Sequence, residues 1–118
     1  MPVRLTPLPA EQFAAIRERI SAGDADRADL RAATKHLLAL LNEKAPGHSV
    51  EVRVPPYAAV QCIPGARHTR GTPPAVVEMD APTWIALALG ETDWAAAVGA
   101  GKVQASGERS DISAYLPV

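Results

Sequence analysis

Residues 76–118 read VVEMDAPTWIALALGETDWAAAVGAGKVQASGERSDISAYLPV and contain most of the boundary signals in the chain. A short β-branched run ends at Asp80, where the pattern changes to one typical of a helix start. The Asp80 side chain can cap free backbone N–H groups, and Pro82 is tolerated in a first helical turn. This stretch therefore predicts a strand that leads directly into a helix.

The predicted helix after Asp80 is apolar around most of its circumference. Two rows of apolar side chains recur at helical spacing, and Gly90 follows them as the C′ residue. The rows are formed by Trp84, Ile85, Leu87, Ala88 and Leu89. A helix with so little polar surface is expected to be largely buried.

A second short helix is predicted to begin at Thr92, which can act as its N-cap, and to end at the glycines of residues 99–101. Its apolar side chains are Trp94, Ala97 and Val98. Residues 102–106 then alternate polar and small apolar side chains, like a strand, and Ser110 or Asp111 can open a last helical turn. The predicted order is strand, helix, helix, strand and helix.

The residues before this stretch predict two more helices and two more strands. Apolar side chains recur at helical spacing over residues 13–20 and 30–41. Residues 48–54 alternate valines with polar residues, the period-two pattern of a strand with one solvated face. Another strand is predicted at residues 57–63, and the third strand is the β-branched run at residues 75–79.

These elements predict one α+β domain over residues 1–118, with a mainly antiparallel sheet and helices packed on one face. Residues 1–28 are predicted to form an N-terminal helical extension of this domain, and residues 29–118 are predicted to form its core. The alternation of apolar and polar residues along the strands favours an antiparallel sheet with one solvated face, since a parallel sheet buried on both faces would show unbroken apolar runs. Solvent-facing strand residues are expected at Glu51, Arg53, Lys102 and Gln104.

Composition and charge argue against several classes of function. A net charge of −1 and a pI of about 6.3 provide no basic field for phosphate backbones, so no nucleic-acid partner is expected. A single cysteine excludes an intrachain disulfide framework and a Cys-rich metal site, and it fits a reducing compartment. The N-terminus lacks the apolar core of a signal peptide, and no stretch approaches the ~20 apolar residues of a membrane span. We therefore expect a cytoplasmic protein that does not insert into membranes.

The ordered features of the second half resemble the C-terminal half of the sterol carrier protein 2 (SCP2) family. They are Asp80, Trp84, Gly90, Ala97, Gly101, Lys102 and Gly107. Residues 50–84, VEVRVPPYAAVQCIPGARHTRGTPPAVVEMDAPTW, are similar to a short bacterial, actinobacterial-type branch of that family, whose members are compact stand-alone chains. The resemblance implies an SCP2-like fold with an apolar ligand cavity between the sheet and the helices. Family members bind sterols, fatty acids or fatty acyl groups.

The two tryptophans are the largest side chains on the helices predicted to cover the sheet. Together with neighbouring apolar residues they can line a pocket for an apolar chain. The candidate wall consists of Trp84, Leu87, Trp94, Val98, Val77 and Met79. The alternative is that these side chains fill a small core and leave no ligand cavity.

The segment 64–74, PGARHTRGTPP, is the longest irregular stretch inside the predicted domain. Its cations, imidazole and hydroxyls can hold a carboxylate or phosphate head group at a polar mouth of the pocket. The candidate residues are Arg67, His68, Thr69 and Arg70. The alternative is that the two arginines pair with surface carboxylates such as Glu78 or Asp80 and hold the loop in place.

Other reactive side chains are interpreted structurally. Cys62 is in register with Val60 on a predicted strand, so we expect a small buried hydrophobic residue rather than a nucleophile. Neither His36 nor His48 has a carboxylate or cysteine at ligand spacing, so no metal site is predicted. No cofactor is predicted either.

Three functions follow from these predictions. The first is a noncatalytic carrier that binds a lipid or other apolar small molecule, fatty acyl or sterol-like, between the sheet and the helices. The second is a protein-interaction or self-association module of the same fold, such as a homodimer, with a closed cavity. The third is a small enzyme that acts on an anionic substrate through His68 and the neighbouring arginines.

Overall fold

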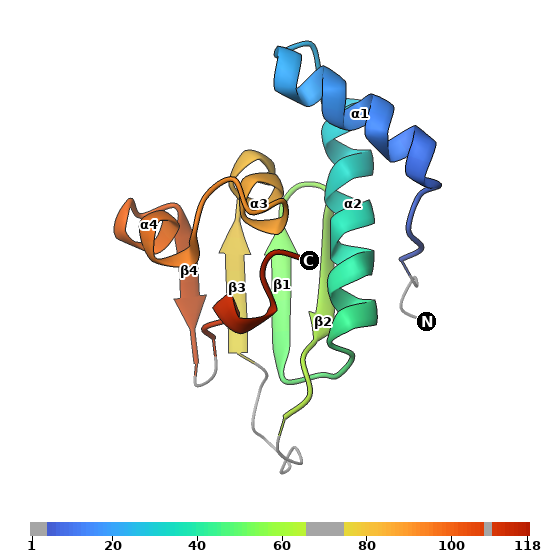
Figure 1. Cartoon of the computed structure of the whole chain (residues 1–118). Helices are drawn as coiled ribbons and strands as arrows, with labels where there is room; N and C mark the ends of the chain where they lie inside the picture. The colour runs from blue at the N-terminus through green and yellow to red at the C-terminus, as the bar shows by residue number, and fades with distance from the viewer. Residues whose placement is uncertain (1–4, 66–74, 108–109) are drawn as a thin grey trace.

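The computed structural model describes residues 5–65, 75–107 and 110–118. Within this part of the chain, four strands form one sheet in the order β2-β1-β3-β4 (Figure 1). The strands are β1 (Val50–Val54), β2 (Ala58–Cys62), β3 (Ala75–Met79) and β4 (Val103–Ser106). β2 and β4 pair antiparallel with their neighbours, whereas β1 and β3 run parallel at the centre. The predicted mainly antiparallel sheet is confirmed, and the parallel central pair was not indicated by the strand patterns.

The two faces of the sheet follow the alternation of the valines. Val50, Val52 and Val54 are completely buried on one face of β1. Glu51 and Arg53 lie on the opposite face, where their side chains form an ion pair. One face of the sheet is therefore dry and the other is solvated, as period-two alternation predicts.

Helices cover the dry face of the sheet, so the predicted α+β layout is confirmed (Figure 1). The helices of the described residues are α1 (Ala10–Ala22), α2 (Arg27–Lys44), α3 (Ala81–Ala88) and α4 (Trp94–Gly99), followed by the short 3-10 helix η1 (Ser113–Tyr115). α2 and α3 pack against each other, α4 contacts β4, and α1 lies across one end of α2. α2 also packs on β2, and the inward-facing residues of the central strands β1 and β3 are all buried.

Short polar signals set the ends of α3 and α4. Asp80 accepts a hydrogen bond from the first turn of α3 at 2.9 Å, as predicted. Gly90 follows α3 with a φ of 78° and is its C′ residue. Asp93, rather than the predicted Thr92, caps α4, because the Asp93 carboxylate accepts the backbone N–H of Ala96 at 2.7 Å. The prediction for this helix start was wrong by one residue.

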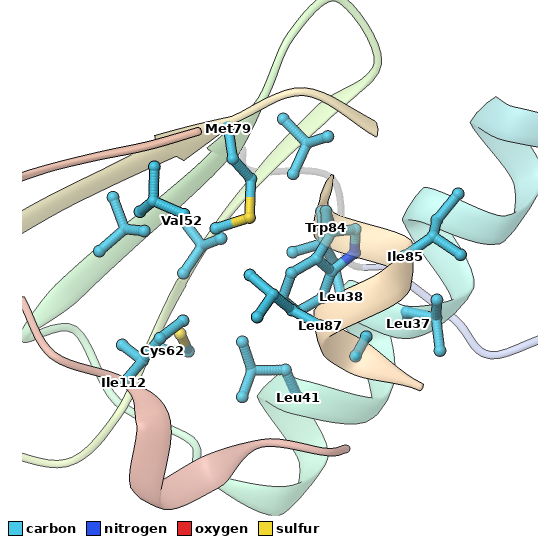
Figure 2. Close-up of a cluster of buried hydrophobic side chains, with 14 of the residues drawn as sticks. Leu37, Leu38, Leu41, Val52, Cys62, Met79, Trp84, Ile85, Leu87 and Ile112 are labelled. Carbon is cyan, nitrogen blue, oxygen red and sulfur yellow. The ribbon is translucent and has the colours of Figure 1, made fainter. Parts of the chain in front are cut away.

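The hydrophobic core lies between the dry face of the sheet and the α2 and α3 helices (Figure 2). Trp84 is the largest of its fully buried side chains. Cys62 lies in the same cluster, and burial raises the pKa of its thiol to about 12. The interpretation of Cys62 as a small buried hydrophobic residue is confirmed.

His36 on α2 holds the segment that precedes α1. Its Nδ1 accepts a hydrogen bond from the backbone N–H of Leu8 at 2.8 Å, and its ring stacks on Phe13 with 4.1 Å between centroids. An imidazole can accept at Nδ1 only while that nitrogen is unprotonated. Burial lowers the pKa of His36, and the charge of Glu43 opposes this effect only in part.

Acid is expected to destabilise the protein through His36. Because the native pKa is lower than the ordinary value of about 6.5, the unfolded chain takes up this proton first as the pH falls. The contribution of His36 to stability is therefore complete above about pH 6.5 and is lost as the pH falls through the native pKa.

The comparison of wild type with His36→Asn tests this pH dependence. The asparagine amide can accept the Leu8 N–H but does not titrate. Free energies of unfolding measured from roughly pH 7.5 to pH 5 should fall more steeply in the wild type than in the variant. Parallel curves for the two proteins would show that His36 makes no pH-dependent contribution.

Candidate functional site

Four of the six predicted wall residues lie in the buried layer between the sheet and the helices. Val77 and Met79 come from β3, and Trp84 and Leu87 come from α3. Their exposed fractions are 0%, 3%, 0% and 1%, respectively. Figure 2 shows Met79, Trp84 and Leu87 within the hydrophobic cluster. These four side chains therefore belong to the core of the domain.

Trp84 connects α3 to α2 by a polar contact as well as by packing. Its indole N–H donates a hydrogen bond to the backbone oxygen of Thr34 at 3.3 Å. A buried tryptophan needs such a partner for its N–H group, because an unpaired buried donor is destabilising. Trp84 thus fixes α3 against α2 within the helix layer.

The other two predicted wall residues lie on α4, away from Trp84. In α4 the buried residue is Ala97, whereas Trp94 is half-buried and Val98 is 43% exposed. α4 is a helix of six residues that packs on the edge strand β4, so little sheet lies beneath it. The structure therefore does not bring Val98 into the same wall as Trp84.

A surface recess of about 580 Å³ lies between the α3–α4 connection and the C-terminal segment. Two of the predicted wall residues border it: Trp94 of α4 contributes half-buried apolar surface, whereas Leu87 of α3 is only 1% exposed. Leu116 and Pro117 complete the apolar lining from the C-terminal segment and were not among the predicted site residues. The recess thus joins parts of the chain that are separated in the sequence.

The C-terminal wall of the recess is attached to the helix layer at several points. Lys44 Nζ donates a hydrogen bond to the backbone oxygen of Pro117 at 2.7 Å. The backbone N–H of Val118 donates to the oxygen of Ala88 at 3.0 Å. The Pro117 ring lies 3.5 Å from the position that a Cβ atom on Gly90 would take. These contacts hold the segment after η1 against α3 as a wall.

The polar lining of the recess comes mainly from the α3–α4 connection. Glu91, Thr92 and Asp93 lie there in succession, and Ser113 adds a hydroxyl from the C-terminal side. The Asp93 carboxylate is held in place by its hydrogen bond to the first turn of α4. The recess therefore combines an apolar lining with a hydrogen-bonding, acidic rim.

A family model described as "Bacterial SCP ortholog" matches residues 26–118. The chain belongs to this SCP family. The match begins at the N-cap of α2 and includes the sheet, α2, α3, α4 and the recess, whereas α1 lies outside it. The resemblance to bacterial sterol carrier proteins is confirmed by this match, which indicates a carrier-type protein. No curated protein matches the chain.

The polar mouth predicted for this SCP family member lies outside the described residues. It comprises Arg67, His68, Thr69 and Arg70. Their binding roles, and the enzyme function through His68, stay predictions. Asp80, one of the carboxylates suggested as their partners, is engaged at the start of α3. There, hydrogen bonds from Thr83 hold the pKa of Asp80 below its usual range, and the charge of Lys102 adds to this effect.

The described part of this SCP family member contains no group of three or more His, Cys, Asp or Glu side chains placed to hold a metal ion. His36 is engaged with Leu8 and Phe13. His48 Nδ1 lies 3.1 Å from Gln61 Oε1. Across the same described residues, no helix is both long enough and apolar enough to cross a bilayer.

Proposed function

We propose that this SCP family member is a noncatalytic carrier and that its apolar ligand, a fatty acyl or sterol-like molecule, binds in the recess beside Trp94. The observation that carries the proposal is the apolar lining formed by Trp94, Leu116 and Pro117 inside a solvent-open recess. Its volume of about 580 Å³ falls within the ~300–1,000 Å³ typical of small-molecule sites. Membership of the SCP family supports the assignment to carriers.

Burial of the ligand's methylene groups supplies the affinity in this proposal. Each buried methylene contributes about 0.8 kcal/mol, so eight contribute roughly 6 kcal/mol before the costs of ordering are subtracted. No reaction on the ligand is required. The Cys62 thiol takes no part, because it is buried and its raised pKa of about 12 keeps it protonated. A free cysteine also fits the reducing, cytoplasmic location that we propose.

The two tryptophans allow a direct test of where the ligand binds. Trp84→Phe leaves Trp94 in the recess as the indole reporter, and Trp94→Phe leaves Trp84 in the core. Dodecanol is a suitable uncharged probe. We expect a saturable shift of the emission to shorter wavelength in wild type and Trp84→Phe, because the ligand removes water from Trp94. No saturable change in either protein, or an equal change in Trp94→Phe, would overturn the proposal.

A pair of alanines on α4 provides a matched steric test. Ala96 lines the recess, whereas Ala95 is exposed on the same helix outside that lining. Ala96→Phe should fill the recess and weaken dodecanol binding by at least roughly tenfold, the loss expected when burial worth about 1.4 kcal/mol is removed. Ala95→Phe should bind as the wild type does. Equal affinities for the two variants would place the ligand elsewhere.

A self-association module is the second candidate function. It is favoured by the burial of Val77, Met79 and Trp84 in one hydrophobic cluster between the sheet and the helices. The exposed Val98 offers apolar surface on α4. A mass that rises with protein concentration, together with no dodecanol binding, would favour this function over the carrier.

A further inference from the structure

The rim of the recess carries negative charge. Glu91 and Asp93 both line the recess, and both are exposed to solvent. Among the described residues, ion pairs form between Arg19 and Asp29 and between Glu51 and Arg53. Neither rim carboxylate is therefore neutralised by a described cation.

The position of this charge is defined by the helix that follows it. Asp93 Oδ1 accepts the backbone N–H of Ala96 at 2.7 Å, which holds the carboxylate at the start of α4 beside Trp94. Lys44 also touches the lining, but its Nζ is engaged with the backbone oxygen of Pro117 on the opposite wall. Among the described residues, the two negative charges of Glu91 and Asp93 therefore exceed the one positive charge that Lys44 brings to the recess.

Trp94 adds an aromatic surface to the acidic rim. An ammonium group is attracted to the face of an indole ring, and the attraction strengthens when the cation leaves bulk water. Carboxylates beside the ring attract the same group by Coulomb forces and repel an anionic head group. An aromatic ring and acidic side chains together are therefore complementary to a cation, and Leu116 and Pro117 are complementary to an aliphatic chain.

We propose that, among ligands with a fatty acyl or sterol-like apolar part, the recess selects those with a cationic ammonium head over those with a carboxylate head. This inference rests on the proposed function, since it names the ligand class of the same recess. The ammonium group lies at the rim formed by Glu91 and Asp93, against the ring of Trp94. The aliphatic chain lies along Leu116 and Pro117.

Three probes of equal chain length separate charge from apolar burial: dodecyltrimethylammonium, dodecanol and dodecanoate. The two ionic probes are used below their micelle concentrations and dodecanol below its solubility limit. Titrations of Trp84→Phe, followed by Trp94 fluorescence, give the three affinities. We expect the ammonium compound to bind roughly tenfold more tightly than the alcohol and the carboxylate roughly tenfold more weakly. The preference should shrink as salt is added, because exposed charges are screened.

Substitution of the rim carboxylates tests their part in the preference. In the double variant Glu91→Gln and Asp93→Asn, the asparagine can still cap α4, and the ratio of ammonium to carboxylate affinity should fall toward one. Glu18→Gln, an exposed site on α1, is the matched control for loss of a carboxylate and should keep the wild-type ratio. An unchanged ratio in the double variant would overturn the inference.

The outcomes distinguish this inference from the function on which it rests. If none of the three probes binds, the carrier proposal itself fails. If dodecanol binds and Ala96→Phe blocks it, but dodecanoate binds as tightly as the ammonium compound, the carrier proposal stands and the cationic selectivity is wrong.

Discussion

Replacement of Trp84 with alanine is expected to lower the free energy of unfolding by about 3–5 kcal/mol, the range measured for buried aromatic residues truncated to alanine. The side chain is 0% exposed and lies in the core cluster with Leu38 and Leu87 (Figure 2). Its loss leaves a cavity between α3 and α2 and removes the hydrogen bond to the backbone of Thr34. Urea unfolding followed by far-ultraviolet circular dichroism measures the change without relying on tryptophan fluorescence.

Trp94→Ala is the matched control for Trp84→Ala. The same atoms are removed, but Trp94 is half-buried at the recess and α4 buries little against the sheet. We expect a loss of about 1 kcal/mol, typical of a side chain outside the core. Equal losses for the two variants would contradict the assignment of Trp84 to the core and Trp94 to the surface recess.

Gly47→Ala is expected to lower the free energy of unfolding by about 2–4 kcal/mol, the sum of backbone strain and overpacking. Gly47 has a φ of 154°, and a Cβ atom there would lie 2.1 Å from the backbone oxygen of Ile63 and 2.4 Å from its carbonyl carbon. Ile63 cannot easily move, because its backbone N–H donates to Ala45 at 2.6 Å and its oxygen accepts from Ser49 at 2.7 Å. Ile63 directly follows β2, and its hydrogen bond to Ala45, the C-cap of α2, joins the end of β2 to the end of α2.

Gly99→Ala serves as the control for Gly47→Ala. A Cβ atom on Gly99 would meet nothing within 4 Å, and the residue lies in the last turn of α4. Alanine favours helix by up to about 1 kcal/mol relative to glycine, so this variant should be unchanged or slightly more stable. Thermal melting of both variants measures the contrast. A Gly47→Ala protein as stable as Gly99→Ala would show that the junction with Ile63 can relax.

The helices and strands were predictable because their signals are local. The cap at Asp80, the C′ glycine at residue 90 and the alternating valines of β1 each depend on a few adjacent residues. Thr92 was a wrong choice of N-cap for α4, because Thr92 and Asp93 both have capping side chains. The backbone conformation at the helix entry selects between them.

The candidate site was predictable only in part. Leu87 and Trp94 were predicted together from helical spacing, and both line the recess. Leu116 and Pro117 were not predicted as site residues. The C-terminal segment meets α2 through Lys44 and Pro117 and meets α3 through Val118 and Ala88, and these contacts join residues remote in sequence. Val98 was grouped with Trp84, but spacing along a helix does not tell how much sheet lies beneath that helix.

Residues 76–118 by themselves determined a strand, two short helices, a further strand and a last turn, because propensity, capping and alternation act over a few residues. The tertiary structure decided that β3 pairs in parallel with β1, that Trp84 is enclosed in the core, and that Trp94 faces the C-terminal segment across a recess. These outcomes depend on which surfaces meet when the chain closes on itself. The contacts involved join residues far apart in sequence, so no local pattern encodes them.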